Sequence, residues 1–276
     1  METRYSVDPV HFKTMTTAEL REKFLIESLF DGDGPNLFYI DTDRIIVGGV
    51  RPTKPTGLKV GASITGTDHL LDRREVGIIN LGEPGAVRAD RKSYELAGLD
   101  VLYVSTGTKE IEFSSADASK PARFYLVCVP SHARFPTRRV TEAEAESEAL
   151  GDQEQANKRT IYRYIHTGGI KSSQLVMGFT RLESGSVWNT MPPHTHSRRS
   201  EVYLYFGFPK DDVVFHYMGS PQETRHLVVR EGQAVASPSW SIHSGSGTRA
   251  YSFVWAMAGE NQTFADMDGV SIAGIM

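Results

Sequence analysis

Several features are scarce in this chain of 276 residues. It has one cysteine, Cys128, so no disulfide can form within the chain, and the surrounding apolar run 124–129 predicts a buried structural thiol. No apolar run approaches the roughly 18 residues that a membrane-spanning helix needs, and the first residues lack the apolar segment of a secretory signal. We therefore expect a cytoplasmic protein that has no membrane partner.

Neither sign of charge dominates the chain. It has 30 Lys and Arg against 34 Asp and Glu, which leaves a net charge of −4. That balance provides no basic field for nucleic acid, so a nucleic-acid partner is not expected. Hydrophobic residues make up 39 % of the chain and charged residues 23 %, as in folded globular proteins. The length is enough for two medium-sized domains, each with a core of its own.

The pattern of apolar residues predicts an all-β protein with a short N-terminal helix. Residues 16–30 begin with a threonine cap and carry apolar residues at helical spacing, which predicts one amphipathic helix. Short β-type runs bounded by Gly, Pro, Asn and Asp then follow one another closely, which is typical of an antiparallel sandwich or barrel. These runs include 43–50, 77–81, 100–104 and 124–129 before the acidic span, and 160–165, 174–182, 201–206 and 212–218 after it.

The acidic, polar span after residue 140 predicts a surface connector between two domains. We therefore divide the chain into a first domain at 1–140, a connector at 141–159 and a second domain at 160–276. The second domain is expected to be a β-barrel of about seven or eight strands.

Metal-type ligands are concentrated in one stretch of the second domain. His194 and His196 flank one residue, so in an extended segment both imidazoles project from the same face, and Glu201 follows five residues later. His243 offers a fourth ligand after a short strand and a proline turn. Imidazole and carboxylate together suit Zn, Fe, Ni or Mn better than Ca or Mg. We expect these four side chains to bind one transition metal.

The same residues resemble the two motifs of the cupin superfamily. The first motif is matched by Gly185, His194, His196, Glu201 and Gly207, and the second by Gly232, Pro238 and His243. The first glycine lies farther from the histidine pair than usual, and Trp240 replaces the inner glycine of the second motif. All four ligands are retained despite these departures. The resemblance implies a barrel with the metal inside.

An internal similarity indicates a duplication. Residues 73–82 resemble residues 198–207, and 98–104 can take the place of 232–238. This alignment keeps Glu75 in the frame of the motif but brings no histidine pair with it. The sequence therefore predicts a bicupin, in which the first jelly-roll-like barrel binds no metal and the second binds one ion.

Over its whole length the chain resembles one cupin family, the 5-keto-4-deoxyuronate isomerases (4-deoxy-L-threo-5-hexosulose-uronate ketol-isomerases) of pectin breakdown. The segments that carry the resemblance are 43–50, 188–196, 219–226, 237–245 and 259–268. The resemblance implies a homo-hexameric bicupin with one Zn²⁺ per chain, held by His194, His196, Glu201 and His243. It also implies a small-molecule deoxyuronate substrate and conversion of 5-dehydro-4-deoxy-D-glucuronate to 3-deoxy-D-glycero-2,5-hexodiulosonate.

Such an isomerisation needs a base, an electrophile and a group that binds the uronate carboxylate. Glu223 and Arg225, two residues apart, are the predicted base and carboxylate clamp, although the two can also form a simple surface ion pair. Tyr203 and Trp240 are the predicted substrate-binding walls, or else parts of the barrel core. Other residues considered for the site are Arg198, Arg199, His216, His226 and Trp255.

Two other functions fit the same ligands. Two His and one Glu are also the ligand set of non-haem iron enzymes, so a cupin dioxygenase is one alternative. The other is a metal-stabilised sugar-binding cupin without turnover, because four protein ligands can close a zinc site and make it structural.

Overall fold

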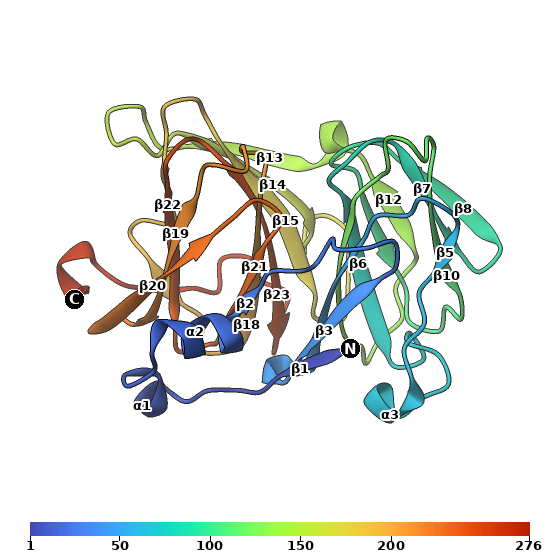
Figure 1. The fold of residues 1–276 in the computed structure, drawn as a ribbon, viewed down its shortest axis with the longest axis horizontal. Coiled ribbons are helices and arrows are strands. Elements are labelled where there is room, and N and C mark those ends of the chain that lie inside the picture. The colour runs from blue at the N-terminus through green and yellow to red at the C-terminus, as the bar shows by residue number, and fades with distance from the viewer.

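The chain forms two β-barrels that lie side by side in a computed structural model describing residues 1–276 (Figure 1). The first barrel has a seven-stranded and a four-stranded sheet. Its seven-stranded sheet has the order β1 (Glu2–Arg4), β3 (Asn36–Ile40), β4 (Ile45–Val50), β11 (Phe124–Pro130), β6 (Arg74–Asn80), β9 (Val101–Val104), β12 (Arg138–Val140). Its four-stranded sheet has the order β5 (Thr56–Gly57), β10 (Ile111–Ser115), β7 (Gly85–Ala89), β8 (Lys92–Leu96).

The second barrel repeats this plan. Its seven-stranded sheet has the order β13 (Glu146–Leu150), β14 (Arg159–Ile165), β15 (Val176–Leu182), β23 (Ser252–Gly259), β18 (Arg199–Phe206), β21 (Ala234–Ser237), β2 (Leu25–Ile26). Its four-stranded sheet has the order β16 (Trp188–Asn189), β22 (Ile242–Gly247), β19 (Val214–Ser220), β20 (Glu223–Val229). A separate pair consists of β17 (His194–Thr195) and β24 (Asp268–Gly269). The predicted all-β bicupin is confirmed.

Helices are few and short. They are α1 (Pro9–Phe12), α2 (Thr17–Phe24) and α3 (Ala62–Thr65), with 3-10 turns η1 (Thr42–Arg44), η2 (Glu142–Glu144) and η3 (Ile272–Gly274). None of them combines the length and the apolarity that crossing a lipid bilayer requires.

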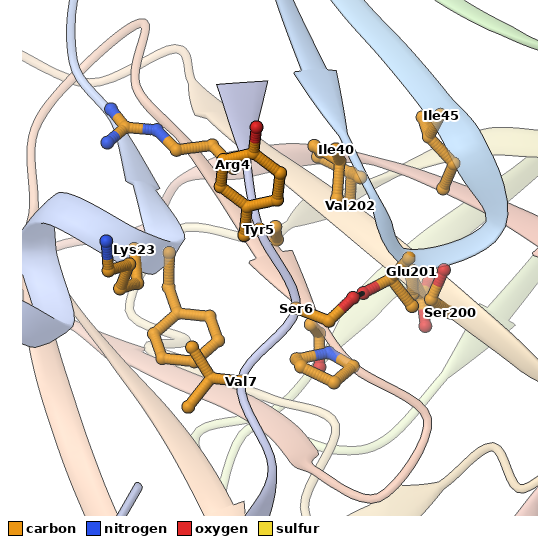
Figure 2. Close-up of a pocket in the computed structure, with 15 residues that line it drawn as sticks. Arg4, Tyr5, Ser6, Val7, Lys23, Ile40, Ile45, Ser200, Glu201 and Val202 are labelled. Atoms are coloured by element: carbon orange, nitrogen blue, oxygen red, sulfur yellow. Dashed lines mark hydrogen bonds between the residues drawn. The ribbon is translucent and has the colours of Figure 1, made fainter. Parts of the chain in front are cut away.

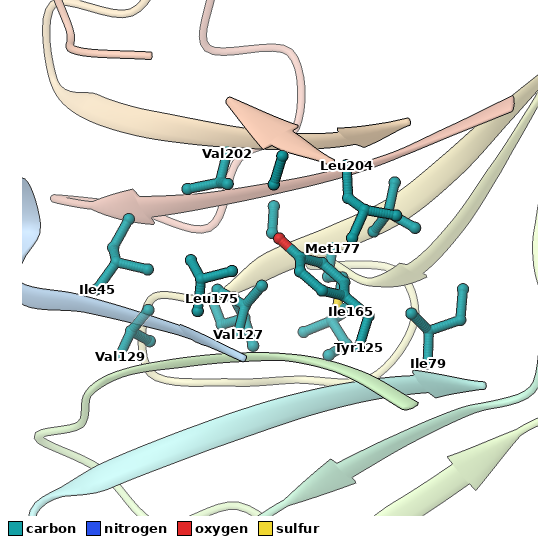
Figure 3. Close-up of a cluster of buried hydrophobic side chains, with 14 of the residues drawn as sticks. Ile45, Ile79, Tyr125, Val127, Val129, Ile165, Leu175, Met177, Val202 and Leu204 are labelled. Atoms are coloured by element: carbon teal, nitrogen blue, oxygen red, sulfur yellow. The ribbon is translucent and has the colours of Figure 1, made fainter. Parts of the chain in front are cut away.

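The two seven-stranded sheets face each other and share one apolar core. A cluster of 27 buried residues joins them, among them Ile79 and Val127 from the first barrel and Met177 and Leu204 from the second (Figure 3). The sheets approach so closely at Gly77 that a Cβ atom there would lie 2.6 Å from the sulfur of Met177. Burial of apolar side chains from both sheets therefore stabilises the contact between the two barrels.

Each barrel also has an interior core of its own, and the two interiors differ in chemistry. The first is filled mainly by aliphatic side chains, such as Val76, Ile78 and Leu126, together with Cys128. Burial raises the pKa of the Cys128 thiol to about 12, as expected for a structural cysteine. The second interior contains the aromatic rings of residues such as Tyr203, Tyr205, Tyr251 and Trp255.

After β1, which belongs to the first barrel, the segment containing α1 and α2 packs on the second barrel, as the blue helices in Figure 1 show. The capping box predicted at Thr16 is present, since its hydroxyl and the carboxylate of Glu19 each accept from the other residue's backbone N–H. The expected helix over 16–30 is wrong in its extent, because α2 ends at Phe24. The next two residues form β2, in which Leu25 pairs with Val235 of β21. Strand pairing overrides the helical spacing here.

The span predicted as a connector contains a strand. β13 pairs with β14, and Glu146 and Glu148 bind the guanidinium of Arg163 at 2.7 and 2.8 Å. Acidic residues of this span therefore form ion pairs with a basic residue on the neighbouring strand. The domain boundaries at 140 and 160 stay a prediction.

Candidate metal centre

Three elements bring the four predicted ligands together inside the second barrel. His194 lies on β17, Glu201 on β18 and His243 on β22, while His196 lies in the turn between β17 and β18. Their ligand atoms all lie within 4.8 Å of one another. The Nε2 atoms of His194 and His196 are 3.2 Å apart, and that of His243 lies 3.0 Å from that of His194. The Oε2 atom of Glu201 lies 2.9 Å from Nε2 of both His196 and His243.

These separations fit ligands that share one ion. Neighbouring ligand atoms at about 2.0 to 2.1 Å from a zinc-sized ion lie roughly 2.9 to 3.4 Å apart, and four of the six separations here are 2.9 to 3.2 Å. Three imidazole nitrogens and one carboxylate oxygen are also the donor types that such ions prefer. The residues present therefore fit a transition-metal ion.

Outer contacts prepare the imidazoles for metal binding. The carbonyl of Asp266 can only accept, so Nδ1 of His196 donates to it at 2.9 Å, and Nε2 is the nitrogen left to face the other ligands. His243 has its Nδ1 atom 3.3 Å from the hydroxyl of Ser237. Such contacts on the outer nitrogen fix the tautomer and the ring orientation that a metal needs.

Burial and neighbouring groups set the protonation states of His194 and Glu201. His196, Glu201 and His243 are only 2 %, 3 % and 1 % exposed. Burial, followed by the proximity of His243, lowers the pKa of His194 to about 2, so this imidazole is neutral at pH 7. Burial alone would raise the pKa of Glu201, but the charge of His243 and hydrogen bonds from His196 and His243 lower it overall. The carboxylate is therefore ionised.

The C-terminal segment is fastened over the centre by two arginines. Arg199 is almost fully buried and donates to the carbonyls of Thr263, Phe264 and Asp266 at 2.6 to 3.0 Å. Its neighbour Arg198 forms ion pairs with the carboxylates of Asp266 and Asp268. These arginines position the peptide group that orients His196.

A cavity of about 250 Å³ opens beside the centre, and His194, His196 and Glu201 form part of its wall. Its volume is near the lower end for ligand pockets, which begin at about 300 Å³. Tyr203, as predicted, is part of the lining, and Trp255 is another part. Further lining residues are Leu150, Arg159, Ile161, Thr180, Asn189, Thr190, Met191, Pro192, Phe253, Met257, Phe264 and Met267.

A second hollow lies on the other side of β18, and Figure 2 shows it between the N-terminal residues 4–7 and the strand residues 200–202. Its volume of about 20 Å³ is room for little more than one water molecule. This hollow is therefore too small for a sugar acid.

Several predicted site residues lie elsewhere. Arg225 donates to the main-chain carbonyls of Lys13 and Met15, and its guanidinium is 4.0 Å from Glu223, so neither residue lines the cavity. Trp240 packs against Phe12 and donates to the carbonyl of Val7 at 3.2 Å, outside the cavity lining. The roles predicted for these three residues stay predictions.

The two remaining histidine candidates also lie apart from the cavity lining. His216 is fully buried, and its Nδ1 atom is 2.7 Å from the hydroxyl of Tyr205. Burial lowers the pKa of His216 to about 3. His226 is exposed and contacts the ring of Phe215. Acid–base roles for His216 and His226 stay predictions.

Sequence reasoning missed Arg159 and Thr190 in the cavity wall. Arg159 begins the first strand after the acidic span and alternates with Ile161, which also lines the cavity. The sequence shows that Arg159 and Ile161 lie on the same face of the strand, but it does not show that this face borders the cavity. No sequence pattern indicated that Phe264 and Met267 line the cavity, because both lie in a segment with little regular structure.

Comparisons with known proteins agree with this architecture. Residues 24–270 match the model of the KduI/IolB family. The chain is 51 % identical to a 4-deoxy-L-threo-5-hexosulose-uronate ketol-isomerase of Caldicellulosiruptor bescii over 270 residues, 98 % of each chain. It is 51 % identical to the protein of the same name from Opitutus terrae, over the full length of both.

Solved structures show the same fold at low sequence identity. An IolB-like protein from Salmonella typhimurium superposes with a TM-score of 0.71 at 13 % identity, covering 90 % of this chain and 96 % of that one. Bacillus subtilis oxalate decarboxylase superposes with a TM-score of 0.59 at 12 % identity, covering 90 % and 79 %. The match to the family model and the full-length relatives lead to one conclusion: the chain belongs to the KduI/IolB family.

Proposed function

We propose that this protein is a metal-dependent ketol-isomerase that converts 5-dehydro-4-deoxy-D-glucuronate to 3-deoxy-D-glycero-2,5-hexodiulosonate in polyuronide breakdown. The observation that carries the proposal is the four-ligand cluster, three of whose members line a sugar-sized cavity. The chain that contains this cluster is 51 % identical, over nearly its whole length, to proteins named for this activity.

Zinc is the proposed metal, with one ion per chain. Three imidazoles and one carboxylate, whose ligand atoms lie within 4.8 Å of one another, support it. When bound, the ion would act as a Lewis acid toward the oxygens on C1 and C2 of the substrate. The four ligands hold that ion at the wall of the cavity, where a substrate can reach it.

The reaction moves a carbonyl group from C1 to C2 without changing the composition of the molecule. A proton leaves C2, the O2 proton is lost, and protons are added to C1 and O1. Burial raises the pKa of Tyr203 well above its ordinary value, so this phenol stays protonated and serves as a hydrogen-bond donor to a substrate oxygen. Its hydroxyl lies 3.3 Å from that of Thr190, which helps to position it. The apolar side chains around them, such as Phe253 and Met257, exclude water.

The base and the assembly remain proposals that rest on the sequence. Glu223 as the base and Arg225 as the carboxylate clamp rest on the sequence alone, and their position outside the cavity wall argues against both roles. A homo-hexamer and a cytoplasmic location are proposed from the family resemblance and from the composition. Light scattering coupled to gel filtration measures the number of chains.

The decisive experiment incubates the purified protein with the unsaturated uronate released by a pectate lyase and follows formation of the 2-ketose by NMR. We expect conversion that is lost in His243→Ala and on chelation, and restored by zinc. Absence of conversion by the zinc-loaded protein would overturn the proposal. Metal analysis and an oxygen electrode test the dioxygenase alternative in the same preparation, since an isomerase consumes no oxygen.

A further inference from the structure

The walls of the cavity beside the metal ligands contain one cationic side chain apart from the histidines. Arg159, at the start of β14, is the only Arg or Lys in that wall, and Glu201, a metal ligand, is the only carboxylate. The rest of the wall is polar but uncharged, or apolar. A guanidinium in such surroundings is costly to desolvate unless an anion compensates it.

No carboxylate of the protein compensates Arg159. Its guanidinium makes one hydrogen bond to the protein, from Nη1 to the carbonyl of Asn157 at 2.8 Å, and no ion pair. Its partners on the neighbouring strands are Leu150 and Leu182, which have no side-chain acceptor. Five N–H donors in a fixed fork therefore have a single protein partner.

Other arginines near this part of the barrel are satisfied. Arg163, four residues along the same strand, pairs with Glu146 and Glu148. Arg181, on β15, pairs with Glu142 at 2.9 Å. The sheet thus supplies counter-ions where arginines are structural, and Arg159 is the exception.

We propose that Arg159 binds the carboxylate of the substrate and makes this site selective for sugar acids over neutral sugars. The inference rests on the proposed function for the identity of the acid. A hexuronate has its carboxylate and its C1–C2 group at opposite ends of a six-carbon chain. The cavity has Arg159 and the metal ligands in its wall, so one molecule can reach both. A planar guanidinium binds a carboxylate through two parallel hydrogen bonds.

Other features of Arg159 agree with this role. Burial lowers its pKa, while the nearby phenols of Tyr203 and Tyr251 act in the opposite direction. The ring centroid of Tyr203 lies 5.3 Å from that of the ligand His243. Tyr203 lines the same cavity as Arg159 and the metal ligands, so it can contact the bound chain as well.

The test measures binding of a saturated hexuronate and of its primary amide to the zinc-loaded protein by calorimetry. We expect the wild type to bind the acid about 10- to 100-fold more tightly than the amide, the usual size of a charge-assisted contact. Arg159→Gln should remove that preference and leave the zinc content unchanged. Arg159→Lys keeps the charge without the fork and should retain only part of the preference.

Arg181→Gln is the matched control, since Arg181 lies on the adjacent strand outside the cavity wall. We expect it to keep the full preference for the acid. An unchanged preference in Arg159→Gln, or equal weakening of acid and amide, would overturn the proposal. If Arg159→Gln does not fold, a full preference in Arg159→Lys would overturn it instead. Isomerisation without any dependence on Arg159 would refute only this inference, whereas acid preference without isomerisation would refute only the proposed function.

Discussion

The two barrels have the same strand plan but different interiors. In each, the fifth strand of the seven-stranded sheet lies between a short sixth strand and a long fourth one. In the first barrel Val76 pairs with Val104 and Cys128, and in the second Glu201 pairs with Ser237 and Met257. Val76 is therefore the structural counterpart of Glu201. One scaffold thus holds an aliphatic core in one copy and a cluster of four candidate metal ligands in the other.

This register corrects the frame in which Glu75 was aligned with the motif. Glu75 is the counterpart of Ser200, and both face the junction between the barrels. The Glu75 carboxylate accepts from the backbone N–H groups of Ser173, Gln174 and Leu175 at 2.8 to 3.0 Å. In the opposite direction, Ser200 donates from its N–H and its hydroxyl to Asp43 of the first barrel. A shift of one residue turns a potential ligand into a link between domains, because neighbouring strand residues face opposite sides.

The strongest test of this comparison gives the second barrel the residue of the first. In Glu201→Val the centre loses its only anionic ligand, so we expect metal content and turnover to fall by more than about 100-fold. Atomic absorption and the 2-ketose assay measure the two quantities. Retention of stoichiometric metal would show that three imidazoles suffice.

The reverse exchange is Val76→Glu, which buries a carboxylate among aliphatic side chains. We expect a loss of unfolding free energy of about 3 to 5 kcal/mol, because no partner compensates the charge. Urea unfolding measures it. The metal content should stay at one ion per chain, since no imidazole cluster surrounds Val76, and a second ion would contradict the comparison.

Glu75→Ala tests the link between the barrels. Three backbone N–H groups and the hydroxyl of Tyr103 lose their acceptor, so we expect a loss of about 2 to 3 kcal/mol in unfolding free energy. The metal content of the folded protein should not change. If the Glu75→Ala protein instead loses its metal at a low urea concentration, the junction between the barrels also stabilises the metal-binding cluster.

Arg199→Met tests the fastening of the C-terminal segment beside the metal ligands. The carbonyl that orients His196 would then be less well positioned, and we expect metal affinity to fall about 10-fold. Competition with a chelator measures the affinity. Limited proteolysis should cut more quickly near residues 260–267, and unchanged rates would argue against a fastening role.

The smallest effects are expected for Glu223 and Arg225, which lie outside the cavity wall. From this placement we expect Glu223→Gln and Arg225→Ala to change kcat and KM by less than about threefold, the scale of a surface ion pair. Steady-state kinetics provide the check. A fall in kcat of about 100-fold or more in Glu223→Gln would restore it as the base. A rise confined to KM in Arg225→Ala would restore the carboxylate clamp.

The ligand set was readable from the sequence because its chemistry is local. His194, His196 and Glu201 lie within eight residues, and His243 follows a recognisable strand and turn. Donor type and strand periodicity were enough to bring their side chains to one face. The all-β class likewise followed from short apolar runs and frequent turn residues.

Only the tertiary structure decided the rest, because it depends on contacts between distant segments. Residues 25 and 26 spaced their apolar side chains as a helix does, yet pairing with β21 made them a strand. Arg225 and Arg159 are both basic strand residues, and nothing local distinguishes them. The fold turns Arg225 toward the carbonyls of residues 13 and 15 and places Arg159 in the cavity without a counter-ion. Which arginine is free to bind a substrate is determined by which neighbours reach it, and those neighbours come from elsewhere in the chain.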